Sequence, residues 1–161
     1  MRIVLTTSSP GSVSCKVDDR QLPCEVALFA NATFDVIGPL IFFNDGLCNK
    51  MDYLHISMSY VEGIIAAVER GNCTFEMKST VAETLGFKAL VVINNNSTYF
   101  PMGTNTNYRS TIPMVMIGMG AIDVDAYRAD FTNVSNWHTI AMKGTSPLSC
   151  PSNSHSDIHV L

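Results

Sequence analysis

The chain has 161 residues, the length of one ordinary domain; 47% of them are apolar and only 15% are charged. This composition excludes a disordered segment and allows one sizeable core without a metal. The net charge of −4 comes without a cluster of Lys and Arg, so we expect no nucleic-acid partner and no binding to an anionic membrane surface.

The first third of the chain predicts short strands separated by turns. The candidate strands are residues 3–7, 25–29 and 36–43, the last interrupted by Gly38 and Pro39. Residues 8–14 are rich in turn formers, and residues 52–61 show no clear pattern, so both segments are expected to be largely irregular.

The middle of the chain predicts a strand–helix–strand unit. Residues 63–68 and 89–93 are continuous apolar runs, as expected of strands buried on both faces. Between them, Thr74 can cap a helix that reaches residue 85, and Gly86 suits the position after its last turn. Such a unit predicts that the two strands are parallel.

The last part of the chain predicts a long loop followed by further strands and a second helix. Residues 94–110 are polar and rich in Asn and Thr, and loops of this length are usually functional or mobile. The expected elements are a strand at 112–117, a short helix near 121–131, a strand at 137–142 and a tail from residue 144.

Cysteines and glycosylation patterns together indicate the secretory pathway, against the alternative of an Asn-rich cytosolic protein. The cysteines are Cys15, Cys24, Cys48, Cys73 and Cys150, and none forms a CxxC pair. The candidate N-glycosylation sites are Asn31, Asn72, Asn95, Asn96 and Asn133.

No apolar stretch is long enough for a transmembrane helix, which needs about 20 residues. The apolar start, residues 1–5, is too short for the core of a signal peptide. A signal peptide that has been removed and a larger parent protein are therefore both expected.

The sequence contains no GxSxG, P-loop, HExxH or GxGxxG pattern. His155 and His159 have metal-like spacing, but they lie in a polar tail without a third ligand nearby. Asp123 and Asp125 suit the first turn of a helix, where carboxylates stabilise the helix dipole. We therefore expect no catalytic residue, no metal and no cofactor.

Cys73 stands where the predicted helix begins, within the stretch RGNCTFEMK. A cysteine at a helix N-terminus can be a nucleophile, because the helix end favours the thiolate, and it can equally be half of a disulfide. An oxidising compartment favours the disulfide. A hydrolase that depends on Cys73 is the alternative, and it would need a histidine base placed by the fold.

The stretch RGNCTFEMKSTVAETLGFKALVVINN, followed by IPMVMIGMGAID, resembles a protease-associated domain. The matching positions are Arg70, Gly71, Cys73, Phe75, Lys78, Gly86, Asn94, Ile112 and Pro113. The core of the match covers residues 63–123, with weaker correspondence from 15 to 142. The resemblance implies an α/β fold, an open β-barrel or sandwich of about six to eight strands with two short helices. The domain would span residues 15–143, between an N-terminal extension at 1–14 and a tail at 144–161.

The segments GLCN and NNNSTYFPMGTNTNY are similar to the lumenal domain of signal-peptide-peptidase-like intramembrane aspartyl proteases, whose catalytic aspartates lie in transmembrane helices. The resemblance implies a non-catalytic lumenal or extracellular module that recognises or positions protein substrates for a membrane-anchored parent. The membrane would be endosomal, lysosomal, Golgi or plasma membrane. A transmembrane ubiquitin ligase, a sorting receptor and a secreted protease are alternative parents.

The ligand implied by the resemblance is a protein or peptide, such as the ectodomain of a membrane-protein substrate. The candidate contacts are Arg70, Asn72, Phe75, Tyr99, Phe100 and Tyr108. Phe75 suits the core better than a binding surface, and the N–H groups at the helix start could hold a carboxylate or carbonyl of the ligand. Lys78 lies one helical turn after Phe75 and can stay solvated.

The resemblance also places a cysteine upstream of the apolar run at residues 63–68, which implies a Cys48–Cys73 disulfide. In the chain-entropy model, a loop of this length stabilises the fold by about 3 kcal/mol and fastens residues 49–62. For the remaining cysteines, we expect a Cys15–Cys150 or a Cys24–Cys150 bridge.

Overall fold

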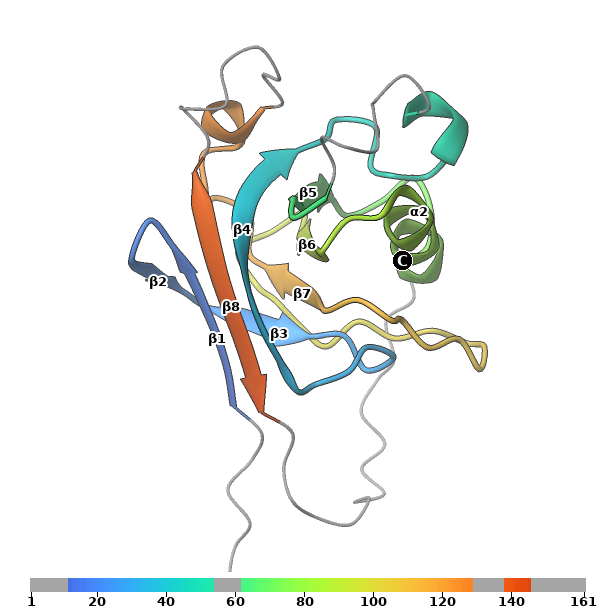
Figure 1. Ribbon diagram of the computed structural model, residues 1–161, viewed down its shortest axis with the longest axis horizontal. Helices are drawn as coiled ribbons and strands as arrows, with labels where there is room; N and C mark the ends of the chain where they lie inside the picture. The colour runs from blue at the N-terminus through green and yellow to red at the C-terminus, as the bar shows by residue number, and fades with distance from the viewer. Residues whose placement is uncertain (1–11, 54–61, 129–137, 146–161) are drawn as a thin grey trace, which may run out of the picture.

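Eight strands form one curled, mixed sheet in the part of the chain that the computed structural model describes, residues 12–53, 62–128 and 138–145. The strands are β1 (Ser12–Val17), β2 (Arg20–Leu22), β3 (Cys24–Val26), β4 (Phe34–Phe42), β5 (Ile65–Glu69), β6 (Ala89–Ile93), β7 (Met114–Ile117) and β8 (Thr139–Thr145). One α-helix, α2 (Phe75–Leu85), and two short 3-10 helices, η1 (Lys50–Tyr53) and η2 (Val124–Tyr127), complete the described elements. The strand order is β2-β1-β8-β4-β5-β6-β7-β3 (Figure 1), which confirms the mixed α/β fold.

The long strand β4 connects an antiparallel half of the sheet to a parallel half. Its residues 34–39 pair antiparallel with β8, and its residues 40–42 pair parallel with β5. Gly38 lies where the two pairings meet, and a Cβ atom there would come within 2.3 Å of the Gly63 carbonyl oxygen. The Gly38-Pro39 pair therefore does not interrupt the strand. The glycine lets β4 pass close to the backbone of Gly63.

The parallel strands β5, β6 and β7 are buried on both faces, as their apolar runs predict. In β6, Leu90 and Val92 pack in the core beneath α2. Ala89, Val91 and Ile93 point the other way and pack in a second core with residues of the antiparallel strands. Because both faces are covered, an uninterrupted apolar run is the pattern that these strands require. The pairing of β5 with β6 is parallel, as predicted.

Helix α2 begins and ends where the local signals predict. The Thr74 side chain accepts a hydrogen bond from the Met77 N–H at 3.1 Å, which satisfies one of the donors at the helix start. Gly86 adopts a left-handed conformation, with φ of 86°, and its N–H bonds the carbonyls of Ala82 and Glu83. Among the described residues, no helix combines the length and apolarity needed to cross a bilayer.

A disulfide between Cys15 in β1, the second strand of the curled sheet, and Cys24 in β3, the last strand, joins opposite sides of that sheet. This pairing contradicts the expected bridge from either cysteine to Cys150, which lies outside the described residues. The physical reason is a β1–β2 hairpin at Asp18 and Asp19, both with positive φ, that reverses the chain. The hairpin returns the backbone to β1 within the nine positions that separate the two cysteines.

The expected helix over residues 121–131 is wrong for its described part, which contains only the single turn η2. The Ala126 N–H bonds the Asp123 carbonyl, the spacing of a 3-10 helix. Arg128 is already extended and forms a parallel bridge with Phe42. Pairing with β4 therefore ends the helix, although Tyr127 is buried as an amphipathic helix would require.

The sheet also extends further than the turn-rich start and the tail suggest. Ser12 pairs with Thr145, so β1 begins within the segment expected to be irregular, and β8 includes Gly144. Cross-strand pairing of the two segments stabilises both as strands, although neither has a strong strand pattern alone. The expected strand at residues 3–7 and almost all of the segment 52–61 lie outside the described residues.

We expect Gly38→Ala to destabilise the fold by about 2 kcal/mol or more, because a Cβ atom would collide with a backbone oxygen that cannot move independently. Urea unfolding measures the loss. Ile37→Ala, at an exposed position of the same strand, is the control and should cost much less. Equal effects of the two substitutions would contradict the proposed close contact.

Candidate functional site

The turn from β5 to α2, residues 70–75, is tight and carries four of the nine motif residues. Gly71 and Asn72 both have positive φ, 111° and 64°, and the Cys73 N–H bonds the Gly71 carbonyl at 2.8 Å. Glycine adopts such a conformation at little cost. The turn leaves Asn72 exposed and directs Cys73 toward the segment before η1.

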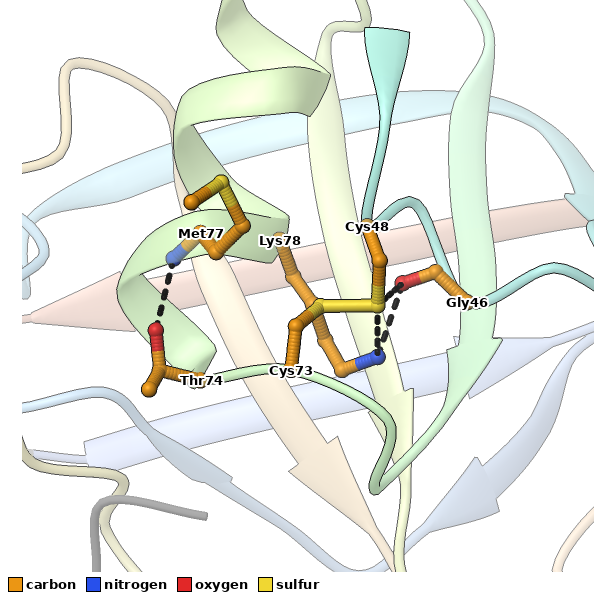
Figure 2. Close-up of a disulfide and its surroundings, with 6 residues drawn as sticks. All are labelled: Gly46, Cys48, Cys73, Thr74, Met77 and Lys78. Carbon is orange, nitrogen blue, oxygen red and sulfur yellow. Dashed lines mark hydrogen bonds between the residues drawn. A yellow bond between two sulfur atoms is a disulfide. The ribbon is translucent and has the colours of Figure 1, made fainter. Parts of the chain in front are cut away.

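Cys73 is bonded to Cys48, with 5.7 Å between the two Cα atoms, so the structure contains the predicted pairing (Figure 2). The bridge fastens the segment around residues 46–50 to the start of α2. It also removes the thiol that a nucleophile needs. The hypothesis of a hydrolase that depends on Cys73 is therefore not supported.

Lys78 is fully buried, contrary to the expectation that it stays solvated. Its Nζ donates a hydrogen bond to the Gly46 carbonyl at 2.7 Å and lies 3.8 Å from Cys48 Sγ (Figure 2). Burial lowers the pKa of Lys78 to about 8, while the Glu69 carboxylate acts in the opposite direction. The segment that Cys48 anchors covers the helix at this point, which the helix sequence alone does not reveal.

A cleft of about 380 Å³ lies at the carboxyl ends of the parallel strands β5, β6 and β7. Its lining includes Arg70 just after β5, Asn95 just after β6, and Met119 and Ile122 after β7. In open α/β sheets, ligands bind at this edge of the strands. The cleft is therefore the candidate binding site.

Asn94 and Phe100 hold Arg70 in place at this cleft. Its Nη1 donates to Asn94 Oδ1 at 3.1 Å, and its Cζ lies 5.0 Å from the centre of the Phe100 ring. Asn94 is itself buried and donates to the Thr98 carbonyl at 2.9 Å. A half-buried, oriented guanidinium is well suited to bind a carboxylate or a backbone carbonyl.

The structure brings together only some of the predicted contacts. Phe75 is completely buried and packs in the core, so its assignment as a peptide contact is wrong. Phe100 lies between Phe75 and Arg70, with ring centres 6.2 Å apart for the aromatic pair. Tyr99 is 43% exposed and belongs to the loop that carries Phe100. Arg70 and Phe100 are therefore adjacent, as a binding surface would require.

Tyr108 lies elsewhere, beside a second cavity of about 370 Å³ that Leu28 and Arg109 also line. Its hydroxyl donates to Ser79 Oγ at 3.0 Å, and burial raises the pKa of Tyr108. This hydrogen bond fastens the long loop to α2. Tyr108 thus has a structural role that its sequence position did not reveal.

The residues of the cleft that sequence reasoning missed include Met119 and Ile122, and Glu69, Ile93, Gly120 and Val124 also line it. Met119 is 57% exposed and follows Gly118, which packs against the Ser97 carbonyl. The only signal in the sequence for Met119 and Ile122 is their position directly after a buried strand, where an α/β sheet presents its ligand-binding edge.

In the described ranges, no three His, Cys, Asp or Glu side chains are grouped to hold a metal ion. His155 and His159 lie outside the described residues. Four of the candidate glycosylation sites are exposed, Asn31, Asn72, Asn95 and Asn96, and Asn133 lies outside the described residues.

In a comparison with known families, the family described as the PA domain matches residues 16–124. A stretch of 72 residues is 39% identical to part of Signal peptide peptidase-like 3 from Arabidopsis thaliana, and covers 43% of this chain and 13% of that protein. The chain thus corresponds to a small part of this relative.

Solved aminopeptidase structures contain the same fold. A zinc aminopeptidase from Bacillus subtilis superposes with a TM-score of 0.63 at 21% identity, over 84% of this chain and 30% of the other. An aminopeptidase from Aneurinibacillus sp. strain AM-1 superposes with a TM-score of 0.64 at 21% identity, over 85% of this chain and 31% of the other. At this identity the similarity shows the fold alone, and the chain spans less than a third of each of these proteins.

The buried Lys78 predicts that stability rises above pH 8. Between its folded pKa of about 8 and its ordinary value of 10.5, the unfolded chain binds a proton that the folded chain does not, so the free energy of unfolding increases with pH. From pH 7 to 9.5 the gain should be about 2 kcal/mol, measured by urea unfolding. Lys78→Met should lack this gain, and subtracting its curve removes the contribution of tyrosine ionisation. If the free energy of unfolding changed with pH in the same way in both proteins, this would contradict the lowered pKa of Lys78.

We expect N-linked glycans on Asn31 and on one of Asn95 or Asn96 when the chain passes through a eukaryotic secretory pathway, because these side chains are exposed. Mass spectrometry of peptides after enzymatic deglycosylation identifies the modified residues. Unmodified peptides at all three positions would argue against passage through this pathway.

Proposed function

Because the chain belongs to the PA domain family, we propose that it is a non-catalytic module that recognises or positions protein substrates for a membrane-anchored parent protein. The partial identity to a signal peptide peptidase-like protein supports an intramembrane protease as that parent. In this arrangement the parent supplies the chemistry and the present chain supplies the contact with the substrate.

The observation that carries this proposal is the cleft at the carboxyl ends of β5, β6 and β7. It combines an oriented guanidinium, that of Arg70, with an exposed apolar side chain, that of Met119. Arg70 can bind a carboxylate or a main-chain carbonyl, and Met119 can adapt to different apolar side chains. The cleft is therefore suited to a short extended peptide that contains both kinds of group.

The two disulfides indicate the lumenal or extracellular side of a membrane, because such bonds persist in oxidising compartments. More narrowly, we propose the lumenal or extracellular side of an endosomal, lysosomal, Golgi or plasma membrane. Its ligand would be the ectodomain of a membrane protein, presented on the same side.

Panning a displayed library of random dodecapeptides against the oxidised chain tests the proposal. We expect enriched peptides with an acidic group close to an apolar residue, and we expect Arg70→Gln to weaken their binding at least tenfold, since hydrogen bonds to charged groups contribute about 1.5–3 kcal/mol. Calorimetry or fluorescence anisotropy measures the affinities. Arg109→Gln makes the same change beside the cavity that Tyr108 lines and should leave these affinities unchanged.

Three results would contradict the proposal. Enriched peptides whose affinity is unchanged in Arg70→Gln would exclude the cleft. A loss caused by Arg109→Gln instead would move the site to the second cavity. Sustained cleavage of the peptides by the purified chain would show an activity that a binding module lacks.

A further inference from the structure

The two disulfides lie in different electrostatic surroundings. Cys15 and Cys24 are 0% and 6% exposed and pack among apolar side chains. Cys48 and Cys73 are both half-buried, and their bridge lies against the Lys78 side chain at the start of α2 (Figure 2). One molecule thus contains a charged disulfide site and an apolar one that serves as its control.

Lys78 holds a positive charge close to one sulfur of this bridge. Its Nζ is 3.8 Å from Cys48 Sγ and is fixed there by the hydrogen bond to the Gly46 carbonyl. The side chain is fully buried, so water screens this charge little. An ammonium group at this distance stabilises a thiolate on Cys48 once the bridge is broken.

The other sulfur is also placed to favour a thiolate. Cys73 directly precedes Thr74, the N-cap of α2, and so lies at the positive end of the helix dipole. The charge of Lys78 is the principal effect and the helix end adds to it. Glu69, the carboxylate that acts on Lys78 from the end of β5, favours the charged form of the lysine, and burial opposes it.

Stabilised thiolates make the reduced form of a disulfide more favourable, and the disulfide correspondingly easier to reduce. In the bridged state the Lys78 ammonium faces neutral sulfur and loses the solvation that water would provide. In the reduced state it gains a negatively charged partner. Both effects favour reduction at Cys48–Cys73 and neither operates at Cys15–Cys24.

We propose that the Cys48–Cys73 disulfide is a site of thiol–disulfide exchange that accepts two electrons from a dithiol reductant. One thiolate of the reductant forms a bond to Cys73 Sγ, the bond between Cys73 and Cys48 breaks, and Cys48 leaves as the thiolate beside Lys78. The second thiolate of the reductant then forms its own disulfide and releases Cys73. The reductant loses two electrons and becomes a disulfide, and Cys48 and Cys73 gain these two electrons. The reductant also gives up two protons, and each cysteine takes up one of them unless it remains a thiolate.

Exchange at this site would change the surface of the domain. The bridge holds the segment around residues 46–50 over Lys78, and the Gly46 carbonyl of that segment accepts the hydrogen bond of the lysine. Reduction would release the segment and expose the lysine. This activity does not depend on the peptide cleft, so a test of one proposal leaves the other unaffected.

The test is an equilibrium titration of the folded chain with mixtures of reduced and oxidised dithiothreitol. A Cys150→Ser background removes the fifth cysteine, and acid quenching, alkylation and mass spectrometry then quantify each disulfide separately. We expect Cys48–Cys73 to be half-reduced at a ratio of reduced to oxidised reagent at least tenfold lower than Cys15–Cys24. An equilibrium measurement is required, because the difference in exposure alone would alter the rates.

Lys78→Met, which conserves most of the side-chain volume, identifies the cause. We expect it to raise the ratio needed to reduce Cys48–Cys73 at least tenfold, about 30 mV, and to leave Cys15–Cys24 unchanged. Lys88→Met, at an exposed lysine whose Nζ bonds the Ile37 carbonyl, is the matched control and should change neither. A shift below twofold in Lys78→Met, or an equal shift of both disulfides, would overturn the proposal.

If Lys78→Met does not fold, the reduced Cys150→Ser chain provides a second readout. The rate at which iodoacetamide alkylates Cys48 is followed against pH, with circular dichroism to monitor folding. A midpoint of the rate–pH curve clearly below the ordinary thiol pKa of about 8.5 supports the proposal. A midpoint at or above that value, including one caused by unfolding on reduction, overturns it.

Discussion

The sheet depends on β4, which takes part in both its antiparallel and its parallel half. Its first residues pair antiparallel with β8 and its last residues pair parallel with β5. The change requires that the backbone near Gly38 pass within contact distance of the Gly63 carbonyl. Where this approach holds, the antiparallel strands can close over one face of the parallel strands, and α2 covers the other.

The carboxyl edge of the parallel strands follows from this arrangement. Strands β5, β6 and β7 run in the same direction, so the residues after them meet at one edge. Arg70, Asn94 and Met119 come from three separate segments and lie around one cleft because of that geometry. The buried Asn94 connects them: its amide orients Arg70 and holds the following loop through the Thr98 carbonyl.

The same turn that places Arg70 at the cleft also places Cys73 at the disulfide, so the binding edge and the bridge share a short piece of backbone. The bridge holds a segment over a lysine whose burial is unfavourable for its charge. Such an arrangement costs stability, and the Gly46 carbonyl offsets part of this cost by accepting a hydrogen bond from the ammonium.

Local patterns in the sequence determine the elements whose stability is local or whose burial is complete. The apolar runs around Ile65 and in β6 predict strands buried on both faces, and Thr74 and Gly86 mark the ends of α2, because capping and hydrophobic burial depend on nearby residues. The resemblance of the motif to a known family adds the Cys48–Cys73 pairing, which spacing alone does not supply.

Only the tertiary structure decides which distant segments meet. The Cys15–Cys24 bridge depends on a hairpin whose Asp18-Asp19 turn has no strong sequence signal, and the end of η2 depends on pairing with β4. The burial of Lys78 depends on a segment about thirty positions earlier in the chain. Burial, pairing across a sheet and electrostatic surroundings arise from contacts between remote residues, and a local sequence pattern does not predict such contacts.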